Sequence, residues 1–419
     1  MSLTAARLDM AVVAWHMIAP LKEPADNLLS RHFRNHHELG IHDRSFIADT
    51  LFGMLRHRRF IEHLAGSTSQ RRLVLAYLAK LSGLNLRELE PLLSRDEMKW
   101  LREIKAQSTD DLPLAIQSEF PEWLMEKLKS FMTDAEILAL GRGMQNTAPL
   151  DLRINTIRTS REEMLHSLES EGISAQPTPY SPTGIRLKNK MSLNRHALFL
   201  SGKVEVQDEG SQLICYLVAP RRHEMIVDFC AGSGGKALLL GALMQNHGRV
   251  YAFDVSDKRL LNLKPRLKRS GLSNVHPQRI AHENDAKIKR LAGKIDRVLV
   301  DAPCSGTGTL RRNPDLKWRQ SAQSIIELKQ KQALILEHAA SLLKPGGRLV
   351  YATCSILPEE NEEIVDGFVK DHLQFKQIYC GGILAQQSIA LDTGAFLRIM
   401  PHTHHTDGFF AAVMEKSNA

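Results

Sequence analysis

A glycine-rich loop follows an apolar stretch in the segment Val227-Asp-Phe-Cys-Ala-Gly-Ser-Gly-Gly-Lys236. The apolar residues read as a buried strand, and the residues after the glycines read as the start of a helix. Glycine lets the backbone approach a ligand closely, and a helix N-terminus favours an anionic group. A strand that leads through such a loop into a helix is typical of an open α/β sheet. The same loop can also be a tight turn that binds nothing.

Strand-like and helical stretches alternate from about Val204 to the end of the chain. Such alternation predicts a mostly parallel sheet that is covered on both faces and binds ligands at the carboxyl ends of its strands. The fold class is therefore α/β, with a Rossmann-like catalytic domain over residues 206–419. We expect strands at 225–229, 250–253, 275–280, 297–300, 348–352, 396–400 and 408–413, with the clearest helices at 258–270 and 321–343.

The residues before this domain show two other patterns. Over residues 1–145 apolar residues recur at three- and four-residue spacing, as in Ile47, Leu51 and Met54, which predicts an all-helical domain. Residues 146–205 show a β-α-β-β pattern, which resembles a small α+β module of the RNA-recognition type. That module lacks the aromatic motif by which such domains stack bases.

Charge and cysteine content narrow the class of protein. The 419 residues carry a net charge of +8, and the whole excess lies in residues 151–419, which favours a polyanionic partner such as nucleic acid. A basic solvated surface would have the same composition. No apolar run reaches the roughly 18 residues of a membrane span, and the five cysteines form no C-x-x-C pair. We therefore expect a cytoplasmic protein with no membrane segment and no metal site.

Two thiols stand at the ends of predicted strands. Cys304 lies in Asp301-Ala-Pro-Cys-Ser-Gly306, and Cys354 lies in Tyr351-Ala-Thr-Cys-Ser355. The glycine spacing and Asp254, at the end of the next strand, fit a nucleotide-dependent oxidoreductase as well as a methyltransferase. Two thiols near two carboxylates suit covalent chemistry better than hydride transfer, because a dehydrogenase has no use for such a pair.

The two thiol motifs and their flanking residues resemble the Sun (NSUN) family of RNA cytosine-C5 methyltransferases. The likeness covers roughly residues 145–419 and includes Thr-Gly-Thr-Leu-Arg-Arg-Asn-Pro-Asp after the first motif and Leu-Pro-Glu-Glu-Asn after the second. The helical front resembles the NusB-like domain of the bacterial Sun (RsmB) members, which methylate 16S ribosomal RNA. The resemblance implies S-adenosylmethionine as cofactor and RNA, most directly ribosomal RNA, as partner of a monomeric enzyme.

The family's functional residues can be carried over one by one. Cys354 matches the nucleophile that adds to C6 of cytosine, and Cys304 matches the second thiol, which helps to release the enzyme after methyl transfer. Asp285 falls where the family has an acid beside the adenine, and Ser233 replaces the usual proline of the loop. The resemblance implies cofactor contacts from Cys230, Ala231, Gly232, Ser233, Gly234, Gly235, Lys236, Asp254, Arg259, Asp285 and Asp301, the last of which also lies near the base.

Four basic residues follow the Pro-Cys motif closely, and we expect them to line the path of the RNA phosphates: Arg311, Arg312, Lys317 and Arg319. Other functions stay open at this point. The chain could methylate transfer RNA, or it could be an RNA-binding assembly factor that keeps the fold without catalysis. A DNA cytosine methylase is a further alternative, but enzymes of that kind use the Pro-Cys thiol as nucleophile, which would leave Cys354 without a role.

Overall fold

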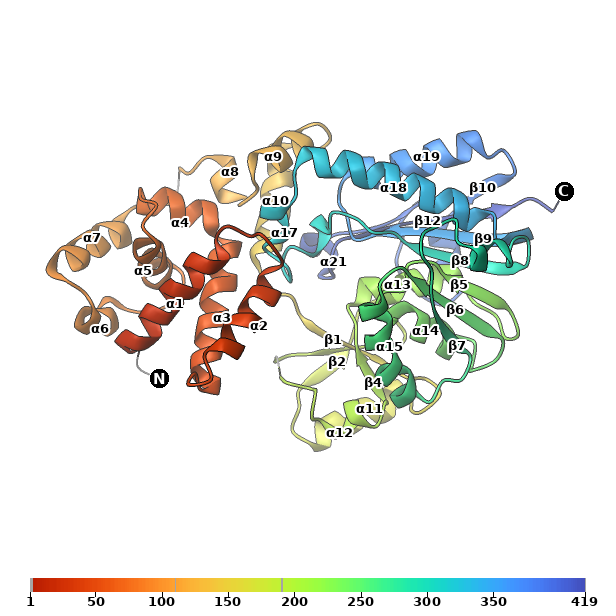
Figure 1. Ribbon diagram of the computed structural model, residues 1–419, viewed down its shortest axis with the longest axis horizontal. Coiled ribbons are helices and arrows are strands. Elements are labelled where there is room, and N and C mark those ends of the chain that lie inside the picture. The colour runs from red at the N-terminus through yellow and green to blue at the C-terminus, as the bar shows by residue number, and fades with distance from the viewer. Residues whose placement is uncertain (1–2, 110, 190, 419) are drawn as a thin grey trace. The chain divides into compact units, whose positions relative to one another are not determined.

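The computed structural model describes residues 3–109, 111–189 and 191–418 and divides into two compact units (Figure 1). Unit 1 comprises Met1–Thr147 and Thr309–Ala322, and unit 2 comprises Ala148–Gly308 and Gln323–Ala419. The chain therefore leaves unit 2 directly after the Pro-Cys motif, contributes a short segment to unit 1, and returns. The sequence predicted an uninterrupted catalytic domain here.

Unit 1 contains only helices among its described residues. The predicted core positions Ile47, Leu51 and Met54 are at most 1% exposed, as their helical spacing requires. Thr133 caps α10 (Asp134–Gln145), the last helix before unit 2, by accepting a hydrogen bond from the N–H of Glu136. The helices of the first segment are α1 (Ala5–Ile18), α2 (Ala25–Asn35), α3 (Ile41–Arg56), α4 (Arg58–Ala65), α5 (Gln70–Lys80), α6 (Leu86–Leu89), the 3-10 helix η1 (Glu90–Leu92), α7 (Arg95–Ala106), α8 (Leu114–Gln117), α9 (Glu122–Lys129) and α10 (Asp134–Gln145).

The segment 309–322 carries the short helix α17 (Leu316–Arg319) and is bound to unit 1 by hydrogen bonds. The indole N–H of Trp318 donates to the carbonyl of Leu55, and the Trp318 ring packs against the core of the helical unit. Asp315 accepts from the peptide N–H of Ala25 at 3.2 Å. These contacts explain why the segment belongs with the helices rather than with the sheet.

Unit 2 begins with a four-stranded antiparallel sheet in the order β2-β3-β1-β4. The β-α-β-β pattern predicted three strands within residues 146–205, and the structure adds a fourth, β4, which pairs with β1 through Ile154 and Val204. Apolar side chains from this sheet and its helices form a core of their own. The elements are β1 (Leu150–Ile154), α11 (Arg161–Ser170), β2 (Ala175–Pro177), β3 (Gly184–Leu187), α12 (Ala197–Leu200) and β4 (Val204–Val206).

The second sheet of unit 2 has the order β10-β12-β9-β8-β5-β6-β7, with β11 paired to β12. Strands β5 to β9 run parallel, and β12 returns antiparallel to β9, so the predicted mostly parallel sheet is confirmed. Residues 344–347 lie within β9, whose register with β8 shifts between Ile295 and Arg297. The strands are β5 (Met225–Asp228), β6 (Arg249–Asp254), β7 (Val275–Arg279), β8 (Ile295–Asp301), β9 (Leu343–Thr353), β10 (Phe375–Ile378), β11 (Leu397–Ile399) and β12 (Phe409–Lys416).

Helices cover both faces of this sheet (Figure 1). Alternate residues of one strand point to opposite faces, so Ile226 joins the core on one side and Val227 joins the core on the other. One face is covered by α13 (Glu209–Val218), α14 (Gly235–Leu243), α15 (Asp257–Ser270) and α20 (Cys380–Ala385), and the other by α16 (Ala286–Lys289), α18 (Ala322–Ala340) and α19 (Glu362–Asp371). In the described ranges no helix is long and apolar enough to cross a membrane.

Candidate active site

A cavity of about 700 Å³ lies at the carboxyl ends of the parallel strands. It is centred on the point where the strand order reverses, because β5 has β6 on one side and β8 on the other. Ligands of open α/β sheets bind at such a switch point. Most of the wall comes from residues at or after the ends of β5, β6, β7, β8 and β9, and the helix α18 adds Lys331 and Ile335. Phe229, Ile280 and Ile335 are among its apolar residues.

The glycine-rich loop forms one side of the cavity. Gly234 has a φ of +79°, and a β-carbon there would lie 2.1 Å from the side chain of Leu263, so the turn requires glycine. Asp254, at the end of β6, accepts the peptide N–H of Gly232 at 2.8 Å and that of Ser256 at 2.7 Å. The carboxylate therefore fixes the loop against the neighbouring strand while it lines the cavity.

Two arginines hold the same loop by its carbonyl groups. Arg153 on β1 is 3% exposed and donates to the carbonyl of Gly235 at 2.5 Å. Arg266 on α15 donates to the carbonyl of Ser233 at 2.7 Å and is itself held by Glu205 on β4. Because Arg153 and Glu205 belong to the four-stranded sheet, that sheet helps to build the cofactor loop. Sequence reasoning assigned this role to neither arginine, because no motif marks it.

An ion pair stands beside the glycine loop. The ammonium group of Lys236 lies 2.7 Å from Oδ2 of Asp301, and the exposed fraction of Lys236 is 9%. Burial alone would lower the pKa of Lys236, but the charge and hydrogen bond of Asp301 outweigh it, so the pKa is raised and the amine stays protonated. Asp301 lines the cavity, which places a carboxylate with a fixed positive partner where a substrate would bind.

The two predicted thiols lie together in the cavity wall. The Sγ atoms of Cys304 and Cys354 are 3.3 Å apart, although 50 residues separate them along the chain. The hydrogen bond with Cys354, together with burial, raises the pKa of Cys304 well above its usual range. Cys304 is therefore a neutral thiol at neutral pH, able to donate its proton to the sulfur of Cys354.

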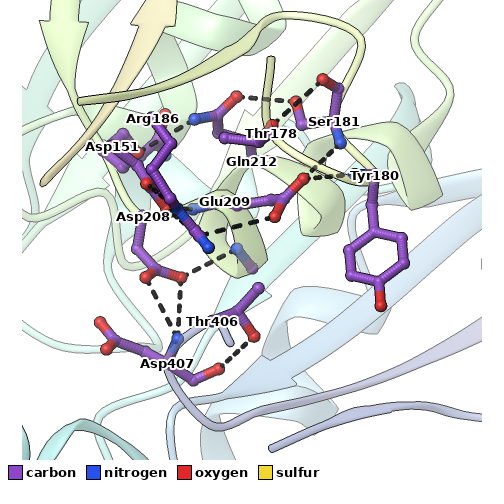
Figure 2. Close-up of polar contacts among 12 residues, drawn as sticks. Asp151, Thr178, Tyr180, Ser181, Arg186, Asp208, Glu209, Gln212, Thr406 and Asp407 are labelled. Atoms are coloured by element: carbon purple, nitrogen blue, oxygen red, sulfur yellow. Dashed lines mark hydrogen bonds and ion pairs between the residues drawn. The ribbon is translucent and has the colours of Figure 1, made fainter. Parts of the chain in front are cut away.

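A cluster of buried charged groups joins the four-stranded sheet to α13 and to the loop before β12 (Figure 2). Arg186 on β3 binds Asp151 on β1 through hydrogen bonds of 2.7 and 2.8 Å. Glu209 accepts two peptide N–H groups of the loop before β3. Asp208 caps α13, and its two carboxylate oxygens accept the N–H of Asp407 at 3.2 and 3.1 Å. The small sheet is thereby fixed to segments that flank the active site.

Most of the predicted cofactor residues line the cavity, but Asp285 is not among them. Its carboxylate accepts the peptide N–H groups of Ala281 and Lys287, and these hydrogen bonds lower its pKa. Asp285 therefore caps α16, and the acidic residue of this loop that lies in the wall is Glu283. Arg259 lines the cavity with a largely exposed side chain. Gly234, Gly235 and Lys236 shape the loop without belonging to the lining.

The structure contradicts the phosphate path predicted for two of the four basic residues. Arg311 and Lys317 are 5% and 4% exposed within unit 1, and the amine of Lys317 donates to the carbonyl of Arg56 at 3.0 Å. A buried lysine that already donates to a protein carbonyl is unable to follow an RNA backbone, and burial leaves little of the Arg311 side chain open to RNA. Arg319 pairs with Asp315 at 3.3 Å, and Arg312 is half-buried, so their contact with RNA stays a prediction.

The cavity fits the cofactor that the sequence implies. Asp254 ends β6 at the place where an acid binds ribose hydroxyls, and the apolar residues around it can hold an adenine ring. Its volume is large enough for a nucleoside that carries an amino-acid chain. In the described part of the chain no group of three histidine, cysteine or acidic side chains is placed to hold a metal ion, which includes the histidines at 402, 404 and 405.

The chain is similar in sequence to known methyltransferases. The family of 16S rRNA methyltransferases RsmB/F matches residues 215–415, and the ferredoxin-like domain of RsmF/B-like methyltransferases matches residues 120–194. A probable ribosomal RNA small subunit methyltransferase B from Synechocystis sp. is 36% identical over 312 residues, which are 74% of this chain and 69% of that protein. The Bacillus subtilis protein of the same description is 32% identical over 310 residues, or 72% and 68% of the two chains.

Among solved structures, the crystal structure of PH0851 is 27% identical and has a TM-score of 0.79, covering 99% of this chain and 100% of its own. The likeness therefore extends over both units. The cofactor is S-adenosylmethionine, as the matched methyltransferase family and the fit of the cavity indicate. Since the chain covers more than two thirds of a relative to which it is 36% identical, it belongs to the RsmB/F family of ribosomal RNA methyltransferases.

Proposed function

We propose that this protein is an S-adenosylmethionine-dependent RNA cytosine-C5 methyltransferase that acts on small-subunit ribosomal RNA through a covalent adduct with Cys354. The observation that carries the proposal is the 3.3 Å separation of two thiols in the wall of a cofactor-sized cavity. Relatives described as ribosomal RNA small subunit methyltransferase B support the choice of RNA. The net charge of +8 is consistent with a nucleic-acid substrate.

Addition of the Cys354 thiolate would activate cytosine for methylation. Carbon C5 of cytosine is a weak nucleophile, and thiolate addition at C6 turns the ring into an enamine whose C5 can attack. The Cys354 thiolate forms a bond to C6 while the ring nitrogen N3 gains a hydrogen bond or a proton at the Lys236–Asp301 pair. The carboxylate of Asp301 accepts from the exocyclic amine of cytosine, which uracil lacks, and so selects the base. S-adenosylmethionine supplies the electrophilic methyl group.

Release of the product assigns a role to Cys304. The proton on C5 passes to water, its electron pair restores the C5–C6 double bond, and the bond between C6 and the sulfur of Cys354 breaks. The neutral thiol of Cys304 donates to the departing sulfur, which stabilises it as a leaving thiolate. The raised pKa of Cys304 supports this proton-donor role rather than a role as the nucleophile.

Covalent trapping on denaturing gels tests these assignments, with S-adenosylmethionine and either ribosomal RNA or transfer RNA. Cys304→Ala should accumulate an RNA-linked band that the further change Cys354→Ala abolishes. Cys230→Ala is the matched control, because Cys230 also lines the cavity but has no proposed covalent role. A band that depends on Cys304 would reverse the roles, as in DNA methylases. No adduct and no methyl transfer with both RNAs would overturn the proposal in favour of a non-catalytic platform.

A further inference from the structure

A completely buried carboxylate lies behind the two thiols. Glu360, at the end of the 3-10 helix η3 (Pro358–Glu360), is 0% exposed. Its Oε1 accepts the peptide N–H of Ser305 at 2.8 Å and the side-chain amide of Gln332 at 2.9 Å. Its Oε2 accepts the hydroxyl groups of Ser305 and Ser355, each at 2.5 Å. Four hydrogen bonds thus satisfy a group whose burial would otherwise be very unfavourable.

The donors come from both thiol motifs. Ser305 follows Cys304 directly, and Ser355 follows Cys354 directly. The two serine hydroxyls also lie 3.2 Å from each other. Because one carboxylate binds the residue after each cysteine, it determines how closely the two loops approach. We propose that Glu360 is a positioning residue that fixes the separation and orientation of the Cys304 and Cys354 sulfur atoms.

The surrounding contacts make this support rigid. Gln332 donates both to Glu360 and to the carbonyl of Pro303, which precedes Cys304. The hydroxyl of Tyr351 on β9 donates to the main-chain carbonyl of Glu360 at 2.6 Å. Gln332 therefore attaches the carboxylate to the helix α18, and Tyr351 attaches the main chain of Glu360 to the central strand β9. Rigid elements behind a site hold its reacting groups more precisely than loops alone.

The negative charge of Glu360 also affects the pKa of Cys304. No lysine or arginine forms an ion pair with Glu360 among the described residues, and its negative charge acts on the thiol of Cys304. This charge contributes to the raised pKa of Cys304, after the larger effects of Cys354 and burial. A second thiolate beside Cys354 is thereby disfavoured, and Cys304 is kept as the neutral partner. Geometry and charge act in the same direction.

This inference rests on the proposed function for its catalytic meaning, but it can be tested without methyl transfer. Phenylarsine oxide binds two neighbouring thiols at once, so its affinity reports their separation. Glu360→Gln should bind it at least tenfold more weakly than the parent protein does, because an amide can no longer accept from all four donors. Glu363→Gln is the matched control, since Glu363 lies three residues further along and pairs at the surface with Lys329.

A second measurement separates positioning from mere folding. In a Cys354→Ala background, the pH dependence of alkylation of Cys304 by iodoacetamide is followed by peptide mass spectrometry. Adding Glu360→Gln should shift its midpoint to lower pH, because a negative charge near the thiol is removed. If Glu360→Gln does not fold, Ser355→Ala removes one of the four hydrogen bonds and should still weaken binding of the arsenical.

The outcomes keep the two proposals apart. Unchanged arsenical affinity and an unchanged alkylation midpoint in Glu360→Gln would overturn the role of Glu360, whatever its methyl transfer. Changed thiol properties in a protein that never forms an RNA adduct would retain the positioning role and overturn the proposed reaction. In the active enzyme, kcat should fall in Glu360→Gln while the KM for S-adenosylmethionine stays within twofold.

Discussion

The peptide N–H of Gly408 donates to the carbonyl oxygen of Gly308 at 2.8 Å, so the loop before β12 lies directly against the loop that follows Cys304. The N–H of Gly308 donates in turn to the carbonyl of Cys354, also at 2.8 Å. A β-carbon on Gly308 would lie 2.2 Å from the Gly408 carbonyl oxygen and 2.9 Å from that of Cys354. Only glycine permits this stack of backbone groups beside the thiols.

Replacing Gly308 by alanine should therefore reduce methyl transfer strongly while the protein remains folded. A displacement of about 1 Å at a reacting group can reduce the rate about 100-fold, and we expect a loss of at least that size. Single-turnover transfer of a labelled methyl group measures it. Gly367→Ala on α19 is the control, because its β-carbon would contact nothing within 4 Å and should stabilise the helix by about 0.5–1 kcal/mol. Equal activity in Gly308→Ala and the parent would contradict this account.

Arg266, one of the two arginines that hold the cofactor loop, can be compared with its neighbour Arg269 in a matched pair of variants. Arg266 and Arg269 both bind Glu205, but in the described structure Arg266, and not Arg269, also donates to the loop, at the carbonyl of Ser233. Arg266→Met should raise the dissociation constant of S-adenosylhomocysteine about tenfold, because a hydrogen bond from a charged donor is worth about 1.5–3 kcal/mol. Arg269→Met should leave it nearly unchanged. Calorimetric titration distinguishes the two, and equal effects would assign the role to Glu205 instead.

Sequence patterns predicted the large sheet well, because its central strands are short apolar runs that end in polar motifs. The strands around Val227 and Val298 were found in this way, and their ends carry the loop and Asp301. The edge strand β10 was not expected, because Phe375–Ile378 has only two large apolar residues among polar ones. Its place in the sheet depends on pairing with β12, which is a long-range contact.

The same distinction applies to the site. Cys304 and Cys354 could be predicted because they lie in unusual local motifs. Lys317 was wrongly predicted to face RNA, because the local sequence around a basic residue is the same whether the residue is buried or exposed. Burial of Lys317 follows from its contact with Arg56 on a distant helix. Glu360 belongs to the motif Leu-Pro-Glu-Glu-Asn, but its hydrogen bonds to the loops after Cys304 and Cys354 are visible only in the structure.

The cap of α13 should matter for activity as well as for stability. Asp208 accepts the N–H of Gly210 within its own helix and the N–H of Asp407 across the active-site flank (Figure 2). Asp208→Ala should lower the free energy of unfolding by about 1–2 kcal/mol, as loss of a cap does, and should also lower kcat. Ser160→Ala removes the cap of α11 alone and should lower stability by about 1 kcal/mol without affecting kcat. Equal kcat in both variants would show that the contact with Asp407 is dispensable.

The stability of unit 1 should depend on the protonation of His57. Burial, reinforced by the positive charges of Lys317 and Arg56, lowers the pKa of His57 from 6.5 to about 4. The folded state therefore keeps the imidazole neutral where the unfolded chain would take up a proton. The contribution of His57 to stability is complete above pH 6.5 and is lost as the pH falls toward 4. Between pH 7 and 4.5 the loss is about 2 kcal/mol.

Tryptophan fluorescence can follow this loss in the full chain, because all four tryptophans, at 15, 100, 123 and 318, lie in unit 1. Urea unfolding at pH 7 and pH 4.5 should show a drop in stability that is about 2 kcal/mol smaller in His57→Gln than in the parent. Burial raises the pKa of Glu119 to about 7, so Glu119 changes the stability with pH in the opposite direction. This contribution is the same in both proteins and cancels when the two drops in stability are compared. His63→Gln, on the helix α4 that follows His57 and with an exposed side chain, should behave like the parent. Identical drops in the parent and His57→Gln would mean that the folded protein accepts a proton at His57 as readily as the unfolded chain does.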